Sequence, residues 1–165
     1  MSFDNSQNRE ISNVAALKVP PHSVDAEQAV LGGLMLDNTE WDNLADVLLP
    51  EDFYRPEHQI IFRVMSLQSE ANSPIDVVTL VESLNSLNEL EGAGGVEYLS
   101  ELTDNARGTA NIHAYAEIIR ERAILRRLIS VANGIANSGY NTGGKKAAAV
   151  LDEAEQQVFN IADER

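Results

Sequence analysis

The chain has 165 residues, of which 44% are hydrophobic and 23% charged, ordinary proportions for one globular domain. It contains no cysteine, which excludes disulfides, thiolate metal sites and thiol nucleophiles. No apolar run approaches the ~20 residues that a membrane span needs, and residues 1–10 lack the basic and apolar segments of a signal peptide. We therefore expect a cytoplasmic protein.

The formal charge of −14 is unevenly distributed along the chain. Residues 1–105 carry 4 basic and 19 acidic side chains, whereas residues 106–165 carry 8 basic and 7 acidic ones. Because proteins bind DNA largely by neutralising phosphates with lysine and arginine, we expect little or no direct DNA binding. The acidic surface either keeps the domain well solvated or steers a basic partner towards it.

The first two-thirds of the chain predict a helical globule. Residues 1–16 show no periodicity and predict a disordered tail, and the paired prolines at 20–21 predict an extended lead-in. Over residues 17–106, apolar residues recur at helical spacing in about five short segments, and no bounded run alternates as a strand does. The predicted helices begin near Ser23, Trp41, Pro56, Asp76 and Gly95.

Two glycines, Gly32 and Gly33, lie inside the first predicted helix. A glycine costs about 1 kcal/mol relative to alanine in a helix interior. We expect the backbone of another helix to approach closely at this point, which would explain why side chains are missing there.

Residues 107–165 predict an antiparallel helical hairpin. Its long helix runs over about 110–138 with Thr109 as the N-cap, a glycine-rich turn follows at 139–144, and a second helix returns. The long helix has two apolar stripes, one a heptad seam broken only at Arg122. One stripe can pair the two helices. The other stripe needs a second surface to bury it, so the hairpin either self-associates or lies across the five short helices.

We expect Ile129, on the heptad seam, to hold the hairpin together and Ile135, on the second stripe, to face a partner. This assignment rests on periodicity and could be reversed. The candidate interface residues are Tyr115, Ile119, Arg122, Leu125, Ile129, Ile135, Val150, Leu151, Ala154 and Val158.

No pattern in the sequence predicts a catalytic, cofactor-binding or metal site. Residues 139–146 nearly match a P-loop, but they lack the serine or threonine that would hold magnesium, and they join two predicted helices instead of a strand and a helix. His22, His58 and His113 have no ligand spacing, so we expect them at the surface or as caps.

Five blocks of sequence occur in a distinctive order: residues 18–36 (KVPPHSVDAEQAVLGGLML), 52–56 (DFYRP), 74–76 (PID), 94–99 (GGVEYL) and 119–123 (IRERA). Together they resemble the N-terminal part of bacterial replicative DNA helicases of the DnaB family, in particular its gamma-proteobacterial members. The resemblance extends over about residues 17–165, so it leaves out only the tail.

The resemblance implies a collar domain of a hexameric helicase. Hairpins would pair two subunits, three such dimers would form the collar, and the collar would dock primase, with a helicase loader as a further candidate partner. ATP and magnesium would bind in an ATPase domain after this region. The fragment would then not be an enzyme, whereas its parent would be an ATP-dependent 5′–3′ DNA helicase.

Two alternatives remain at this point. The helicase-binding domain of a primase would share the globule-and-hairpin plan, although the lead-in at residues 18–23 lies near the start of the chain, where a primase does not carry that domain. Another helical protein-interaction module would also fit, and a small enzyme would require that an acidic cluster bind a metal.

Overall fold

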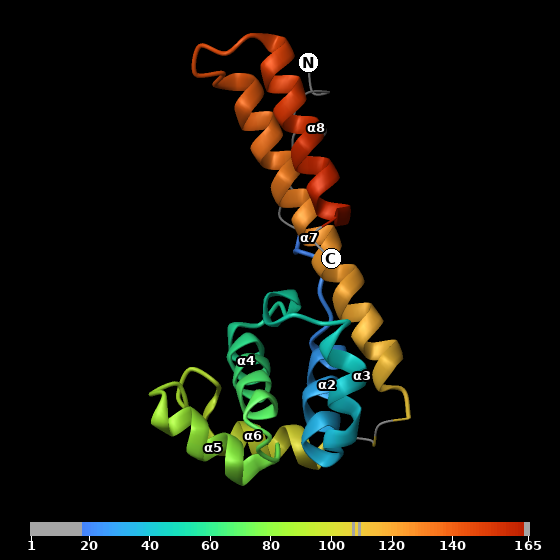
Figure 1. Ribbon diagram of the computed structural model, residues 1–165, viewed down its shortest axis with the longest axis vertical. Helices are drawn as coiled ribbons and strands as arrows, with labels where there is room; N and C mark the ends of the chain where they lie inside the picture. The colour runs from blue at the N-terminus through green and yellow to red at the C-terminus, as the bar shows by residue number, and fades with distance from the viewer. Residues whose placement is uncertain (1–17, 107, 109, 164–165) are drawn as a thin grey trace, which may run out of the picture.

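The computed structural model describes residues 18–106, 108 and 110–163. Within these ranges all regular elements are helical, and a hairpin projects from a globule (Figure 1). The predicted all-α class is confirmed, while the predicted tail and the Thr109 cap lie outside the described residues. The elements are α2 (Val24–Leu36), η1 (Asn38–Glu40), α3 (Trp41–Ala45), η2 (Pro50–Asp52), α4 (Pro56–Glu70), α5 (Val77–Ser86), α6 (Gly95–Asp104), α7 (Ile112–Tyr140) and α8 (Ala147–Asp163).

The helices of the globule begin where side chains can cap them. The Ser23 hydroxyl accepts a hydrogen bond from the backbone N–H of Ala26 at 3.2 Å, which caps α2. Asp76 accepts from the N–H of Thr79 at 2.8 Å, and the Thr79 hydroxyl accepts in return from the N–H of Asp76 at 3.0 Å. Pro56 occupies the first position of α4. These starts agree with the sequence prediction.

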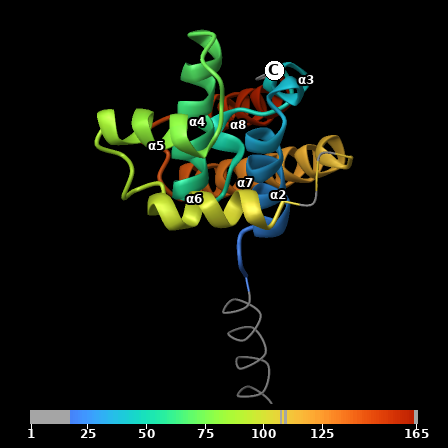
Figure 2. The ribbon, with the colours of Figure 1, turned by 90° about the horizontal axis from the view of Figure 1, so that it is seen from below.

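Helix α2 lies at the centre of the globule, and α6 runs across it (Figure 2). Helices α4, α6 and α7 pack against α2, and apolar side chains of these and the neighbouring helices form one buried core. Burial of each such side chain contributes about 1.5–3 kcal/mol to folding. The most completely buried are Val30, Leu31, Leu34, Leu44, Phe53, Ile61, Met65, Leu80, Leu84 and Leu99.

The crossing of α2 and α6 depends on Gly32. A Cβ atom added there would lie 2.2 Å from the backbone oxygen of Leu102 and 3.0 Å from Cβ of Ala106. The sequence prediction of a close backbone approach is therefore confirmed, since any side chain would separate the two helices.

Helix α7 belongs to both parts of the molecule. At its start Ile112, Ala116 and Ile119 are buried in the core of the globule, so the globule does not end at residue 106 as the sequence predicts. The helix begins at Ile112, with Asn111 as its N-cap, and continues to Tyr140, two residues beyond the predicted end. The apolar stripe over 112–123 is buried against α2, which periodicity alone could not reveal.

The hairpin pairs along a different row from the one we predicted. Ile124, Val131 and Ile135 are half-buried on α7, whereas Ile129 is 47% exposed. On α8 the half-buried residues are Val150, Ala154 and Ile161, while Leu151 and Val158 are exposed. The assignment of Ile129 to the seam and Ile135 to a partner is therefore reversed. The loop at 141–146 returns α8 beside the row of Ile124, Val131 and Ile135, and periodicity alone does not decide between the two rows.

We expect Gly32→Ala to lower the free energy of unfolding by about 1–3 kcal/mol, because the added methyl group would overlap the Leu102 carbonyl. Gly134→Ala is the matched control: Gly134 lies within α7, where a Cβ would meet nothing within 4 Å. This change should leave stability equal or raise it by up to about 1 kcal/mol. Urea unfolding monitored by circular dichroism measures both, and equal effects would contradict the close approach.

Candidate functional site

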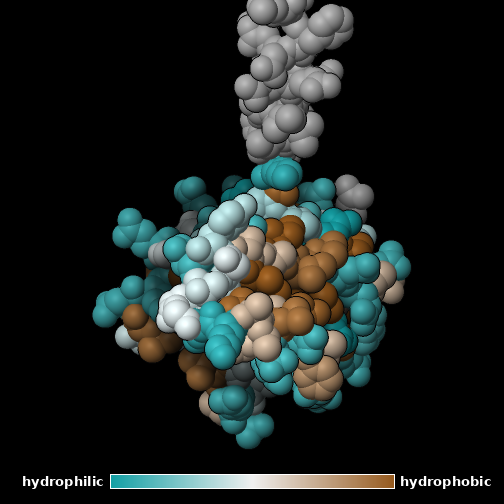
Figure 3. Space-filling view, turned by 90° about the horizontal axis from the view of Figure 1, so that it is seen from above, coloured by the Kyte–Doolittle hydropathy of each residue, from teal (hydrophilic) through white to brown (hydrophobic). Residues whose placement is uncertain are grey.

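The hairpin has an apolar face that no other described part of the chain covers. It consists of Leu125, Leu128 and Ile129 on α7 and Leu151, Val158 and Phe159 on α8, with exposed fractions between 39% and 62%. A shallow, mainly apolar groove lies on it between Ala154, Val158 and Phe159. Figure 3, a view from above the hairpin end of the molecule, shows apolar residues gathered on one part of the surface with hydrophilic residues around them. An exposed patch of this kind is typical of a protein–protein interface.

The predicted interface residues occupy three environments. Leu125, Ile129, Leu151 and Val158 lie on the apolar face. Three others lie between the two helices of the hairpin, where they are half-buried: Ile135, Val150 and Ala154.

The remaining three predicted residues lie nearer the globule. Ile119 is 1% exposed and forms part of the core, so its side chain is not available to a partner. Arg122 is half-buried, and Tyr115 lines a cavity at the globule. The structure brings together the apolar residues of the two hairpin helices but leaves these three apart from them.

That cavity has a volume of about 560 Å³ and lies between α2, α6 and the start of α7. Two carboxylates, those of Asp25 and Glu101, line it together with the rings of Tyr98 and Tyr115, and none of the described residues that line it is basic. Such a lining suits a cationic group and disfavours a phosphate.

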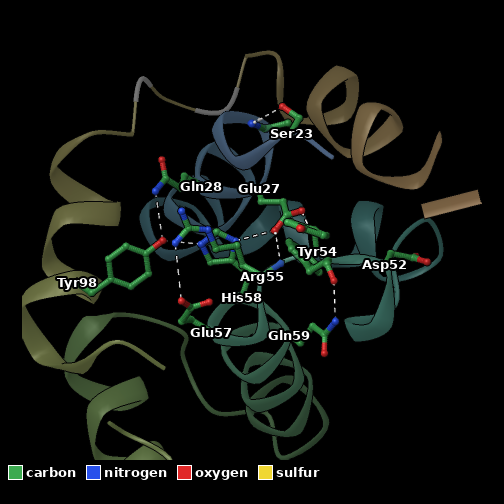
Figure 4. A network of polar contacts seen from close by, with 12 residues as sticks. Ser23, Glu27, Gln28, Asp52, Tyr54, Arg55, Glu57, His58, Gln59 and Tyr98 are labelled. Atoms are coloured by element: carbon green, nitrogen blue, oxygen red, sulfur yellow. Dashed lines mark hydrogen bonds and ion pairs between the residues drawn. The ribbon is translucent and has the colours of Figure 1, made fainter. Parts of the chain in front are cut away.

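A buried polar network joins α2, α4 and α6 (Figure 4). The Glu27 carboxylate, 1% exposed, accepts hydrogen bonds from the backbone N–H groups of Tyr54 at 2.9 Å and Arg55 at 3.3 Å. The Nδ1 atom of His58 lies 2.7 Å from the same carboxylate, and its Nε2 lies 2.5 Å from the Tyr98 hydroxyl. Glu27 thus satisfies N–H groups that precede α4 and orients the imidazole.

His58 therefore differs from its predicted position at the surface or in a cap, because it is fully buried. The carboxylate fixes Nδ1 as a donor, so in the neutral ring Nε2 accepts from the Tyr98 hydroxyl. Burial raises the pKa of Tyr98, so the phenol keeps its proton at neutral pH. One signal for the network existed in the sequence: Glu27 shares the helical face of Val30, Leu31 and Leu34.

A second polar cluster lies where α7 leaves the globule, and sequence reasoning missed it. The Arg126 guanidinium donates to the carbonyl of Pro21 at 2.6 Å and to that of Asp52 at 2.7 Å. It also lies over the Tyr54 ring, 5.4 Å from the centroid, and His22 stacks on that ring at 4.0 Å. Burial lowers the pKa of Arg126, but a guanidinium remains charged in proteins.

The near-P-loop segment joins α7 to α8, in the helical context that the sequence predicts. The Lys145 ammonium lies 2.7 Å from the Glu153 carboxylate. Among the residues that the structure describes, no group of three or more histidine, cysteine, aspartate or glutamate side chains could hold a metal ion. No helix in the described ranges is both long and apolar enough to cross a membrane.

Comparison with known families agrees with the fold and the earlier resemblance. Residues 19–121 match the family described as DnaB-like helicase N terminal domain. The chain belongs to this family. That membership decides against the helicase-binding domain of a primase.

Two relatives that bear the name replicative DNA helicase DnaB show how far the similarity extends. The protein of Haemophilus influenzae is 48% identical over 151 residues, which cover 92% of this chain and 32% of the relative. The protein of Geobacillus stearothermophilus is 40% identical over 155 residues, which cover 94% of this chain and 34% of the relative. This DnaB-family chain therefore spans about a third of the length of these relatives.

Solved structures of the family share the fold. The N-terminal domain of DnaB helicase from Mycobacterium tuberculosis is 34% identical, with a TM-score of 0.82 over 86% of this chain and 99% of that one. The N-terminal domain of DnaB helicase from Helicobacter pylori, described with its interactions with primase, is 27% identical. Its TM-score is 0.60, over 70% of this chain and 90% of that one.

We expect Glu27→Gln to lower the free energy of unfolding by about 2–3 kcal/mol, since a neutral amide would replace a buried, charged acceptor that serves three donors. Glu82→Gln, at an exposed position of α5, is the control and should change stability by less than about 0.5 kcal/mol. Chemical unfolding at pH 7 measures both. An unchanged midpoint for Glu27→Gln would show that the network does not stabilise the fold.

Proposed function

We propose that this domain is the collar of a hexameric replicative DNA helicase, where it serves ring assembly and primase docking and performs no catalysis of its own. The observation that carries the proposal is the apolar face of the hairpin. A second copy of the same face would bury the exposed side chains of Ile129, Leu151 and Phe159. A symmetric pair of this kind is the commonest arrangement of soluble homodimers.

Assembly would then proceed from dimers. Two hairpins would pair through their apolar faces, and three such dimers would close the collar of the hexamer. The candidate contact residues on this chain are the exposed Leu125, Ile129, Leu151 and Val158, with Ile135, Val150 and Ala154 supporting them from between the helices. Arg122 and Tyr115 lie near the base of the hairpin, within reach of a neighbour that extends beyond it.

Primase docking is supported by the Helicobacter pylori domain, whose structure is described together with its interactions with primase. This chain has the same fold and offers two surfaces to such a partner, the hairpin and the acidic cavity beside Tyr98. A helicase loader remains a candidate partner of the whole protein.

Catalysis would lie elsewhere in the parent protein. The relatives are about three times as long as this chain and bear the name of a helicase. We propose that ATP and magnesium bind in the part of the parent that this chain does not span. The parent would be a cytoplasmic ATP-dependent 5′–3′ DNA helicase, and this domain would take part in replication through protein contacts alone.

We expect Ile129→Asn to weaken self-association by roughly ten- to hundredfold, because about 1–3 kcal/mol is lost when a polar amide is buried without partners. Circular dichroism should still show a folded helical protein. The neighbouring change Ser130→Asn, at an exposed position outside the apolar face, should leave association unchanged. Light scattering at several concentrations, and binding of purified primase, measure the effects.

Ile135→Asn provides the complementary test, since Ile135 is half-buried between α7 and α8. This variant should melt at a lower temperature, by several degrees for a loss of about 1–3 kcal/mol. If both isoleucine variants remained as associated, as stable and as able to bind primase as the parent chain, the proposed role of the hairpin would be wrong.

We expect at most weak binding of single- or double-stranded DNA near physiological salt. Four basic against 19 acidic side chains over residues 1–105 oppose the approach of phosphates, and carboxylates line the cavity. Fluorescence anisotropy with a random oligonucleotide at about 150 mM salt tests this expectation. A micromolar dissociation constant under these conditions would contradict it.

A further inference from the structure

The direction of the hairpin is set in a short stretch of α7. Ala123 is the last buried residue of this helix, and about one and a half turns later Leu128 and Ile129 are exposed. Arg126 lies between these points, and its hydrogen bonds to Pro21 and Asp52 place it where the helix leaves the globule.

Arg126 joins three parts of the chain at this exit. Its two terminal nitrogens donate to separate carbonyls, one in the lead-in at Pro21 and one in η2 at Asp52, which lie 105 and 74 residues away in the sequence. The ring of Tyr54 forms the third contact, and the stacked His22 ring holds the lead-in against it. The neighbouring Arg127 adds an ion pair of 3.6 Å to the buried Asp52 carboxylate.

These contacts use properties that only arginine combines. A guanidinium is planar and presents five donors in fixed directions, so it can bond two carbonyls while its face covers an aromatic ring. A lysine ammonium at the same position could retain the charge but not this geometry. Because Arg126 is half-buried, its hydrogen bonds to the two carbonyls are less weakened by water than those of an exposed arginine.

A small change of angle at this exit would move the tip of the hairpin considerably. From Arg126 to Tyr140 the helix extends 14 residues, or about 21 Å. A rotation of about 10° at Arg126 would displace Tyr140 by about 4 Å. The displacement is less than about 1 Å at Ile129, three residues from Arg126, and grows along α7 towards its end. Packing contacts weaken within about 1 Å of separation, so the far part of the hairpin would lose a fixed contact with a partner first.

We propose that Arg126 is a positioning residue that clamps the hairpin in one direction relative to the globule and so holds the apolar face ready for a partner. The role of that face rests on the proposed function, whereas the clamp itself is a property of the isolated chain. Holding a binding surface in its bound orientation raises affinity because less freedom is lost on association.

The absence of native cysteine allows the clamp to be measured with site-directed spin labels. Cysteines replace Thr142 at the hairpin turn and Glu70 at the end of α4, both exposed positions. Double electron–electron resonance, with unlabelled protein in excess to suppress distances between copies, gives the distribution of distances between hairpin and globule. The variants are Arg126→Gln, Arg126→Lys and, as the matched control on the same helix, Arg120→Gln.

We expect a narrow distribution in the parent chain and in Arg120→Gln, and one at least about twice as wide in Arg126→Gln, with equal helicity. Arg126→Lys should remain broad, because the two carbonyl bonds cannot both form. If Arg126→Gln does not fold, Tyr54→Leu tests the same clamp by removing the ring, with Tyr54→Phe as its control. Widths equal to that of the parent chain in folded Arg126→Gln or Tyr54→Leu would overturn the proposal.

Self-association separates this proposal from the proposed function. If loss of the clamp leaves about a tenth of the Arg126→Gln molecules in the competent orientation, their self-association should weaken by about a hundredfold, because both copies in a dimer must be competent. If the distance distribution broadened while self-association stayed unchanged, the claim that the clamp holds the apolar face in the orientation for binding would be wrong. If Ile129→Asn has no effect on association, the proposed function fails, whereas the distance distributions still test the clamp.

Discussion

The continuity of α7 is the constraint on which the rest of the structure depends. Its 29 residues make one helix about 43 Å long, buried against α2 at one end and paired with α8 at the other. Ile112, Ala116 and Ile119 complete the core of the globule, so the hairpin cannot detach without opening that core. The same rigidity carries the apolar face away from the acidic globule, to a position where a second copy could reach it.

Burial of apolar side chains stabilises the globule, but a few polar groups determine its geometry. Glu27 binds the N–H groups of residues 54 and 55, which precede α4, and Arg126 binds the carbonyls of residues 21 and 52. These backbone groups lie in irregular segments or at the end of the short helix η2, where the chain's own helices leave them without partners. Each charged side chain thereby holds a connecting segment against the helix that carries the side chain, and so determines where that segment lies.

The exposed surfaces of the domain are suited to contacts with other proteins. Membership of the DnaB-like helicase N-terminal domain family fits an architecture in which an apolar face is exposed on the hairpin and carboxylates line the cavity of the globule. The buried histidine, which would suggest chemistry elsewhere, instead holds Tyr98 and Glu27 together. The side chains of Glu27, His58 and Tyr98 bond one another across α2, α4 and α6, and these bonds also orient the Tyr98 ring that lines the cavity.

The sequence by itself determined the helical class, most helix starts and the close approach at Gly32, because these depend on local caps, prolines and spacing. It also provided the two apolar stripes of α7, and the order of its motifs was enough to indicate the family. Only the tertiary structure decided which stripe pairs with α8, since the turn at 141–146 selects the side on which the chain returns. It also decided that Ile119 is buried and that His58 contacts Glu27, 31 residues away. Such contacts join segments that are far apart in the sequence, and no local pattern predicts which segments will meet.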